Sequence, residues 1–327
     1  MRSAARVLLL AVVALLVAGV TATEWQAGRR EARAIAEFPP EGRIVEVDGR
    51  RVHAVTRGSG PDLVLIHGAS GNSRDFTWRF VGLLTDRYRV TAFDRPGQGY
   101  TDRAAPGLDG PFATRGESPA EQADLLRAAA AQLGIERPIV LGHSYGGSVA
   151  MAWALADPEG VAAVVDVSGA TMPWPGSLNG LYRANASGLG GALFPPLISA
   201  WAPERFVEAA VEGTFAPQAA PEGYADHLGT ALAIRRSQFR ANARQVNVLR
   251  PHLVEMSARY AALPMPLEIV HGDADTIVPA EVHSVPLSRL VPGANLTILP
   301  GIGHMPHQVA ADAVVAAIDR ARRRAGL

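Results

Sequence analysis

The stretch VLGHSYGGSVA, residues 140–150, decides how the rest of the chain is interpreted. It holds the pattern G-x-S-x-G with Ser144 at its centre, between an apolar run and an alanine-rich run. The pattern alone is weak, because chance produces it in about one of every ten chains of this length. It indicates a nucleophilic serine only if a strand leads into it, a helix follows it, and an acid, a histidine and an oxyanion hole complete the set.

Short apolar runs alternate with helical patterns along most of the chain. A hairpin is predicted over 44–58, where two β-branched runs meet at Asp48-Gly49. Helices are predicted from Ser118, which opens a capping box, and directly after Ser144. Strands buried on both faces of a parallel sheet are predicted at 62–68, 89–99, 139–144, 161–169, 267–273 and 296–301. This order predicts an α/β fold with a doubly wound, mostly parallel sheet.

One long stretch interrupts the alternation. Between residues 172 and 262 no buried strand is predicted, and glycine, proline and short helical patterns dominate. The stretch is too long for a loop, so it is interpreted as a helical cap inserted into the core. The core then has a first part over 42–171 and a second part over 263–327.

The composition excludes several classes of function. The 327 residues suffice for one large domain or for a domain with an insertion. With 48% hydrophobic and 19% charged residues the chain is globular rather than disordered. The formal net charge is zero, so the composition gives no sign of the excess of basic residues typical of a nucleic-acid-binding protein. The lack of cysteine excludes disulfides, thiolate metal sites and a cysteine nucleophile.

The N-terminus carries an apolar segment. Two arginines precede fourteen apolar residues at 7–20, and residues 7–23 carry no charge. This pattern indicates either a cleaved secretory signal or an uncleaved membrane anchor over residues 1–23, and the sequence leaves the choice open. A charged, helix-prone connector is predicted over 24–41. Both alternatives place the protein in the cell envelope, as an anchored or an exported protein.

A serine hydroxyl needs a base to take its proton, and two late histidines compete for that role. His304 lies on a glycine-rich loop directly after the last predicted strand, where the loop can return over the sheet toward Ser144. His307 lies three residues further on and is predicted to begin the last helix. His304 is therefore the preferred base.

The acid that orients this histidine is expected in the loop after the strand at 267–273. Asp275 is preferred, since it belongs to the pattern G-x-x-D-x-x-V-P, and Asp273 is assigned to the turn. The oxyanion hole is predicted to use the backbone N–H groups of Tyr145, directly after the serine, and Ala69, after the first buried strand. The chain order Ser, Asp, His is the order expected for a nucleophile on a strand–turn–helix elbow.

Five motifs carry a resemblance to a known family. They are His67-Gly68, FDRPGQG at 93–99, GHSYGG at 142–147, HGDADTIVP at 271–279 and GIGHMPH at 301–307. With them, about residues 42–325 resemble the α/β-hydrolase family, which includes esterases, lipases, perhydrolases and meta-cleavage C–C hydrolases. The resemblance implies an eight-stranded sheet, a cap between the sixth and seventh strands, and a catalytic triad of Ser144, Asp275 and His304.

The resemblance also narrows the chemistry. Epoxide hydrolases and haloalkane dehalogenases of this fold carry an aspartate where this chain has Ser144, so an acyl-enzyme and a small ester-type substrate are implied. No metal or cofactor is expected. Phe76, Trp78 and Trp174 are candidate walls of a pocket for an apolar acyl or aryl group, and Arg95 is assigned a structural role. Two alternatives stay open: a C–C bond or lactone hydrolase with the same triad, and a non-catalytic relative that binds a ligand.

Overall fold

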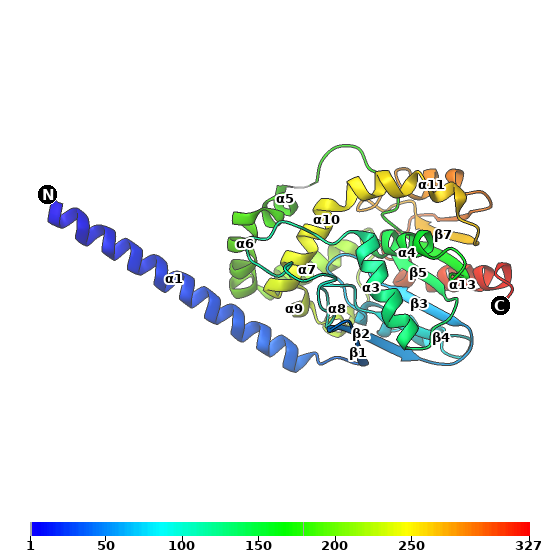
Figure 1. Cartoon of the computed structure of the whole chain (residues 1–327), viewed down its shortest axis with the longest axis horizontal. Helices are drawn as coiled ribbons and strands as arrows, with labels where there is room; N and C mark the ends of the chain where they lie inside the picture. The colour runs from blue at the N-terminus through cyan, green and yellow to red at the C-terminus, as the bar shows by residue number, and fades with distance from the viewer. Residues whose placement is uncertain (1, 179) are drawn as a thin grey trace.

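In a computed structural model that describes residues 2–178 and 180–327, eight strands form a single sheet (Figure 1). The spatial order is β1-β2-β4-β3-β5-β6-β7-β8. β2 runs antiparallel to β1 and β4, and the other neighbours are parallel. The strands are β1 (Arg43–Val47), β2 (Arg50–Arg57), β3 (Asp62–Ile66), β4 (Arg89–Phe93), β5 (Ile139–His143), β6 (Ala163–Val167), β7 (Leu267–Gly272) and β8 (Asn295–Leu299). The predicted mostly parallel, eight-stranded sheet is confirmed.

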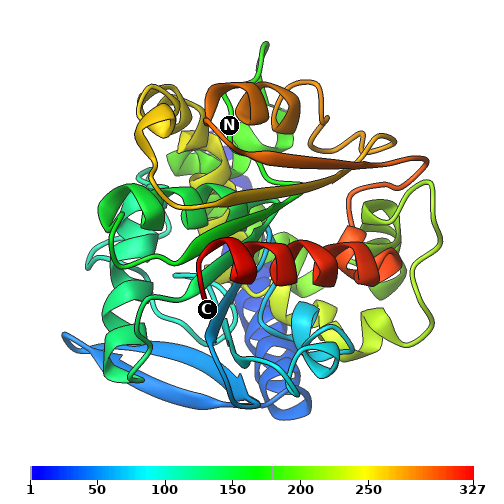
Figure 2. The same ribbon diagram turned by 90° about the vertical axis from the view of Figure 1, so that its right-hand side faces the viewer.

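Helices cover both faces of this sheet. In β3, Val64 and Ile66 join a first core with α3 and α4, whereas Leu63 and Leu65 join a second core with α13. Figure 2 shows α13, in red, crossing one face of the sheet. Both faces of the central strands are buried, and these strands are therefore continuous apolar runs. Such runs are the sequence pattern from which buried parallel strands are predicted. The framing elements are α2 (Arg74–Thr77), η1 (Val81–Leu83), α3 (Pro119–Gln132), α4 (Tyr145–Ala156), α11 (Ser284–Leu290), α12 (Pro306–Val309) and α13 (Ala311–Arg324).

The start of α3 follows the predicted capping box. Ser118 Oγ accepts a hydrogen bond from the Glu121 N–H at 3.1 Å, and Glu121 Oε2 accepts one from the Ser118 N–H at 2.9 Å. Pro119 occupies the first helical position. The box satisfies N–H groups that the helix itself leaves without a partner, so the helix begins at this point in the chain.

The described residues between β6 and β7 form helices joined by turns, and α5–α10 are called the helical insertion below. On α10, Leu249 and Leu253 join the first core beside α3 and α4. The insertion comprises α5 (Gly180–Ala186), α6 (Gly188–Trp201), α7 (Glu204–Thr214), α8 (Tyr224–Leu228), α9 (Thr230–Ala233) and α10 (Arg236–Ser257), and η2 (Tyr260–Ala262) leads into β7. The domain boundaries at 171/172 and 262/263 stay predictions.

The N-terminal segment is one helix, α1 (Arg2–Glu37), that projects from the body of the protein (Figure 1). Its apolar residues 7–20 are exposed, whereas Ala27 and Ala34 are buried. By length and composition alone, the stretch Ser3–Glu37 is apolar enough to cross a membrane. The helix runs without a break from the predicted anchor into the predicted connector.

Candidate active site

Ser144 lies in a sharp turn between β5, which ends at His143, and α4, which begins at Tyr145. Its backbone has φ 54° and ψ −121°, a conformation that strains any residue with a side chain. A glycine lets α4 approach the sheet this closely, since a Cβ on Gly146 would lie 2.1 Å from the carbonyl oxygen of Ile66. The turn holds Ser144 at the carboxyl end of the central strands.

The three residues predicted as a triad meet at this edge of the sheet. His304 Nε2 lies 2.9 Å from Ser144 Oγ, and His304 Nδ1 lies 2.6 Å from Asp275 Oδ2. Since a carboxylate only accepts hydrogen bonds, Nδ1 carries a proton, and Nε2 is then free to accept the proton of the serine hydroxyl. All three side chains are buried.

The Asp275 carboxylate is held from several sides. Oδ1 accepts hydrogen bonds from the N–H groups of Ile277 and Val278 at 2.8 and 2.9 Å. Oδ2 faces His304 and also lies 3.1 Å from His271 Nε2. Burial alone would raise the pKa of Asp275, but the hydrogen bonds from His271 and His304 hold the pKa of this carboxyl well below its usual range. Asp275 is therefore ionised and can stabilise a positive charge on His304.

The two rejected alternatives occupy other positions. Asp273 Oδ1 accepts a hydrogen bond from the Gly301 N–H at 2.6 Å, which joins the loops after β7 and β8. His307 Nε2 lies 3.0 Å from Asp75 Oδ1. In the described part of the chain, Asp273 forms no hydrogen bond with His304, and His307 forms none with Ser144.

The loop after β3 lies against Ser144. A Cβ on Gly68 would be 3.0 Å from Ser144 Cβ and 3.4 Å from Ser144 Oγ, so this backbone passes directly beside the serine. Ala69 follows Gly68 in that loop. Tyr145 is the first residue of α4, and the first N–H groups of a helix are left unused by the helix itself. The fold thus brings both predicted donors next to Ser144, and their action as an oxyanion hole stays a prediction.

Arg95 is fully buried and supports this loop. Its Nε and Nη2 each donate a hydrogen bond of 3.0 Å, to the carbonyl oxygens of His67 and Gly68 respectively. His67 Nε2 accepts from the Arg95 N–H at 2.9 Å, and burial together with the charge of Arg95 lowers the pKa of His67 to about 4. The guanidinium also lies 4.3 Å from the ring centre of Tyr145, whose hydroxyl accepts from Gln122 Nε2 at 3.0 Å. These contacts agree with a structural role for Arg95.

A second histidine–carboxylate cluster, which the sequence motifs do not reveal, lies behind the elbow. Asp75 Oδ1 accepts a hydrogen bond from the Tyr224 hydroxyl at 2.7 Å and faces His307. His143 Nδ1 lies 3.8 Å from Asp75 Oδ2, and His143 Nε2 donates to the His304 carbonyl oxygen at 2.9 Å. The cluster therefore ties the residue before the serine to the backbone of the predicted base. The position of His143 inside the G-x-S-x-G motif is the one signal that could have pointed to it.

The same cluster contains a set of possible metal ligands. The donor atoms of Asp75, His143 and His307 all lie within 4.8 Å of one another, and two histidines with a carboxylate suit a transition metal. Burial and the neighbouring His307 and His304 lower the pKa of His143 well below its usual value, so this ring is neutral. Asp75 forms hydrogen bonds with Tyr224 and His307, whereas among the described residues His143 Nδ1 and His307 Nδ1 are buried without a hydrogen-bond partner.

The three aromatic residues predicted as pocket walls lie in different environments. Phe76 is fully buried in the second core. Trp78 packs edge-on against Tyr224 at 5.5 Å, and Trp174 is half-buried, 6.3 Å from the ring of His283. Contact of these residues with a substrate stays a prediction, and the burial of Phe76 gives it the weakest support of the three.

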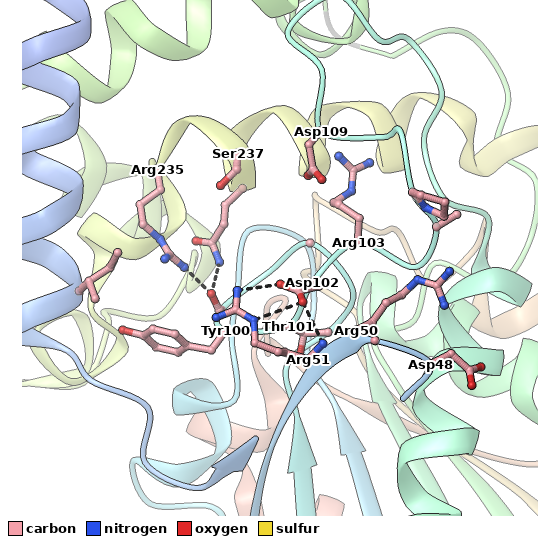
Figure 3. Close-up of a pocket in the computed structure, with 17 residues that line it drawn as sticks. Asp48, Arg50, Arg51, Tyr100, Thr101, Asp102, Arg103, Asp109, Arg235 and Ser237 are labelled. Atoms are coloured by element: carbon pink, nitrogen blue, oxygen red, sulfur yellow. Dashed lines mark hydrogen bonds and ion pairs between the residues drawn. The ribbon is translucent and has the colours of Figure 1, made fainter. Parts of the chain in front are cut away.

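A cavity of about 790 Å³ opens elsewhere, between the end of α1, the β1–β2 hairpin and the start of α10 (Figure 3). In its wall Arg51 and Asp102 form an ion pair at 2.8 Å, and Arg235 donates a hydrogen bond to the Gly99 carbonyl oxygen. Among its lining residues there is no member of the predicted triad, so this cavity is separate from the site at Ser144.

Comparison with known proteins identifies the family. The sequence profile described as "Alpha/beta hydrolase family" matches residues 63–317. An uncharacterised protein of Mycobacterium tuberculosis is 30% identical over 294 residues, which cover 87% of this chain and 81% of that protein. The chain therefore belongs to the α/β-hydrolase family, a family of hydrolytic enzymes, and the predicted resemblance is confirmed.

Solved structures share the fold. An alpha/beta hydrolase fold protein from Burkholderia ambifaria has a TM-score of 0.68 and 26% identity, and covers 84% of this chain and 96% of its own. A membrane phospholipase A has a TM-score of 0.65 and 23% identity, and covers 97% of this chain and 99% of its own. The second likeness concerns the fold alone, and its coverage includes most of α1.

Proposed function

We propose that the protein is a serine hydrolase that cleaves carboxylic esters through an acyl-enzyme. The observation that carries the proposal is the chain of hydrogen bonds from Ser144 through His304 to Asp275, at 2.9 and 2.6 Å. A serine alone is a poor nucleophile, and these two partners are the base and the orienting acid that activate it. The strained turn that presents Ser144 supports the same role.

The reaction would run in two halves. Ser144 Oγ attacks the ester carbonyl carbon while His304 Nε2 takes the hydroxyl proton, and the N–H groups of Ala69 and Tyr145 stabilise the oxyanion. His304 then gives the proton to the leaving alcohol, and the acyl group stays on Ser144. Water, deprotonated by His304, attacks the acyl carbonyl and releases the acid. Ionised Asp275 stabilises the imidazolium in both halves.

The substrate is proposed to be an uncharged ester with an apolar acyl or aryl group. Arg95 lies against the oxyanion loop, but carbonyl and amide oxygens accept from its Nε, Nη1 and Nη2. Its charge is therefore committed within the protein and is not free to bind an anionic substrate. The half-buried Trp174 offers an apolar contact in the segment that leads from β6 to the insertion.

The first test compares Ser144→Ala with Ser148→Ala in the full-length protein. Ser148 is a matched control, since it is a buried serine of the same helix whose Oγ donates to the Tyr145 carbonyl oxygen at 2.7 Å. Turnover of p-nitrophenyl esters of increasing acyl length and labelling by a fluorophosphonate are measured. We expect Ser144→Ala to lose both activities, by roughly 10⁴- to 10⁶-fold in kcat, and Ser148→Ala to keep them.

Other outcomes would favour the alternatives. Turnover of lactones or ring-cleavage products that needs Ser144, without turnover of esters, would support the lactone or C–C hydrolase. Binding of esters without turnover or labelling would support a non-catalytic relative.

We also infer that α1 anchors the enzyme in a membrane of the cell envelope. The support is the exposed apolar stretch 7–20 and its unbroken continuation into a segment that packs on the protein. Membranes washed with carbonate should retain the full-length chain, and its N-terminal peptide should be detectable by mass spectrometry. A soluble chain that starts near residue 23 would instead show that the segment is a cleaved signal.

A further inference from the structure

One face of α6 is apolar and exposed. Leu189, Leu193, Leu197 and Trp201 follow one another at four-residue spacing, are between 47% and 73% exposed, and have the exposed Phe194 beside them. We call these five residues the α6 stripe. α6 contains no charged residue, whereas a helix at a water-facing surface ordinarily turns polar residues outward. A contiguous exposed apolar patch of this kind marks an interaction surface.

The neighbour of the α6 stripe is α1. Trp201 Nε1 donates a hydrogen bond to Thr23 Oγ1 at 3.1 Å. Arg30 Nη1 donates hydrogen bonds to the carbonyl oxygens of Ala200 and Ala202, at 3.2 and 2.8 Å. These carbonyl groups lie at the end of α6 and therefore have no hydrogen-bond partner within the helix. The end of the stripe therefore lies level with Thr23, the last residue of the uncharged segment 7–23.

A second connection fixes the angle between α1 and the insertion. Arg236, at the start of α10, donates to both carboxylate oxygens of Glu31 at 2.7 to 2.9 Å and also pairs with Glu24. With α1 held by two helices of the insertion, its exposed half has a defined direction. Figure 1 shows that this half projects from the end of the body at which α5 and α6 lie.

We propose that the α6 stripe docks on the surface of the lipid bilayer that α1 crosses. The proposal rests on the anchoring by α1 inferred above. The seventeen uncharged residues 7–23 give about 25 Å of helix, close to the ~30 Å apolar thickness of a bilayer. Trp25 and Trp201 are exposed at the end of this segment, where tryptophan is enriched at membrane interfaces. The stripe then continues the apolar surface of α1 into the interfacial layer, where an uncharged apolar helix face is stabilised.

A second copy of the chain is a less suitable occupant. It would cover an apolar stripe, but it would not account for the position of the stripe, whose Trp201 end lies at the level where the apolar segment of α1 ends. A bilayer accounts for the composition of the stripe and for its position.

The test uses the absence of cysteine from the chain, which allows single-cysteine variants of the full-length protein. Leu193→Cys reports the stripe, and Val13→Cys reports insertion of α1. Leu83→Cys is the control, since Leu83 is a similarly exposed leucine in η1. It lies near α13, which Figure 1 places at the opposite end of the body from α6.

Each variant carries an environment-sensitive fluorophore and is reconstituted in vesicles of phosphatidylethanolamine and phosphatidylglycerol, with or without lipids that bear a nitroxide quencher. The nitroxide is shallow for the labels at Leu193 and Leu83, and deep in the acyl chain for the label at Val13, which lies near the middle of the segment 7–23. We expect a blue-shifted emission and a roughly twofold quenching at Leu193, since an interfacial helix face lies about 5–10 Å deep, and no quenching at Leu83. Quenching at Val13 with none at Leu193 would overturn the docking and leave the anchor. Crosslinking between Leu193→Cys copies without lipid quenching would overturn it in favour of self-association.

Absence of quenching at Val13 would overturn both the anchor and the docking. Turnover of a p-nitrophenyl ester is measured on the same samples. Retained turnover without quenching at Leu193 would overturn the docking but not the proposed hydrolase, so the two failures can be told apart.

Discussion

The elbow around Ser144 and the helical insertion differ in how tightly the surrounding structure constrains them. Eleven of the twelve residues of α4 are buried, and glycines set its distance from the sheet. In the insertion, α7 has no buried residue and α6 exposes an apolar face. Residues with many fixed neighbours can hold strained geometry, as Ser144 does, whereas weakly packed helices are free to serve as contact surfaces. The four changes below test this contrast, from the largest expected effect to the smallest.

The first change is Asp275→Asn. An amide can donate to His304 Nδ1 and so favours the wrong tautomer of the base, and we expect kcat on a p-nitrophenyl ester to fall by about 10⁴-fold. Asp273→Asn is the matched control in the same loop, because its Oδ1 can still accept from the Gly301 N–H. An equal loss in both variants would contradict the choice of Asp275 as the orienting acid.

The second change compares a glycine-to-alanine substitution at the elbow, Gly146→Ala, with one in the insertion, Gly213→Ala. Gly146→Ala would place a Cβ 2.1 Å from the Ile66 carbonyl oxygen, so we expect the free energy of unfolding to fall by about 3 kcal/mol or more. Gly213 lies in α7 with no atom within 4 Å of its Cβ position. Gly213→Ala should raise the free energy of unfolding by roughly 0.5–1 kcal/mol through its helix propensity. Both are measured by denaturant unfolding, and effects of the same sign would remove the contrast.

The third change examines a buried carboxyl that lacks the support given to Asp275. Among the described residues neither oxygen of Asp166 has a hydrogen-bond partner, and burial raises the pKa of Asp166 to about 7. The folded state therefore keeps a proton between about pH 4 and pH 7 that the unfolded chain releases, so this group lowers stability as the pH rises through that window.

We expect Asp166→Asn to gain stability relative to the wild type over the same window, by on the order of a few kcal/mol at neutral pH. Unfolding curves recorded from pH 4 to pH 8 measure the difference. Parallel pH profiles for the two proteins would show that Asp166 is paired or hydrated in solution.

The smallest effect is expected from the insertion itself. Asn242, on α10, accepts a hydrogen bond from the Ser70 N–H at 2.9 Å, directly after the predicted oxyanion donor Ala69. Asn242→Ala should lower kcat about tenfold, with KM little changed, because the loop loses one positioning contact. Gln238→Ala is the control, since this buried residue of the same helix donates to Gly99 instead. Equal kinetics in the two variants would show that the insertion does not position the loop.

The sheet and the segments that meet at Ser144 could be predicted because their signals are local. Buried parallel strands are continuous apolar runs, a capping box marks α3, and glycines mark the elbow. The histidine and the acid follow from their places after the last two strands. Each of these patterns is contained in a few neighbouring residues, so it can be recognised without knowledge of the tertiary contacts.

The contacts between distant segments could not be predicted, since hydrogen bonds between their side chains produce no periodic pattern in the sequence. His271 is the second histidine against Asp275, and the pairing of Glu31 with Arg236 spans 205 residues of sequence. The sequence predicts the helices of the insertion only in outline, because α6 contains Pro195 and Pro196, which disturb a helical pattern.

The positive φ of Ser144 has an evolutionary consequence. Holding a serine in this conformation raises the energy of the folded state by on the order of 1–3 kcal/mol, and glycine would adopt it without strain. If selection acted on stability alone, substitution of Ser144 by glycine would be favoured. A serine at this position lowers stability, so it would be retained only if its hydroxyl contributes to fitness.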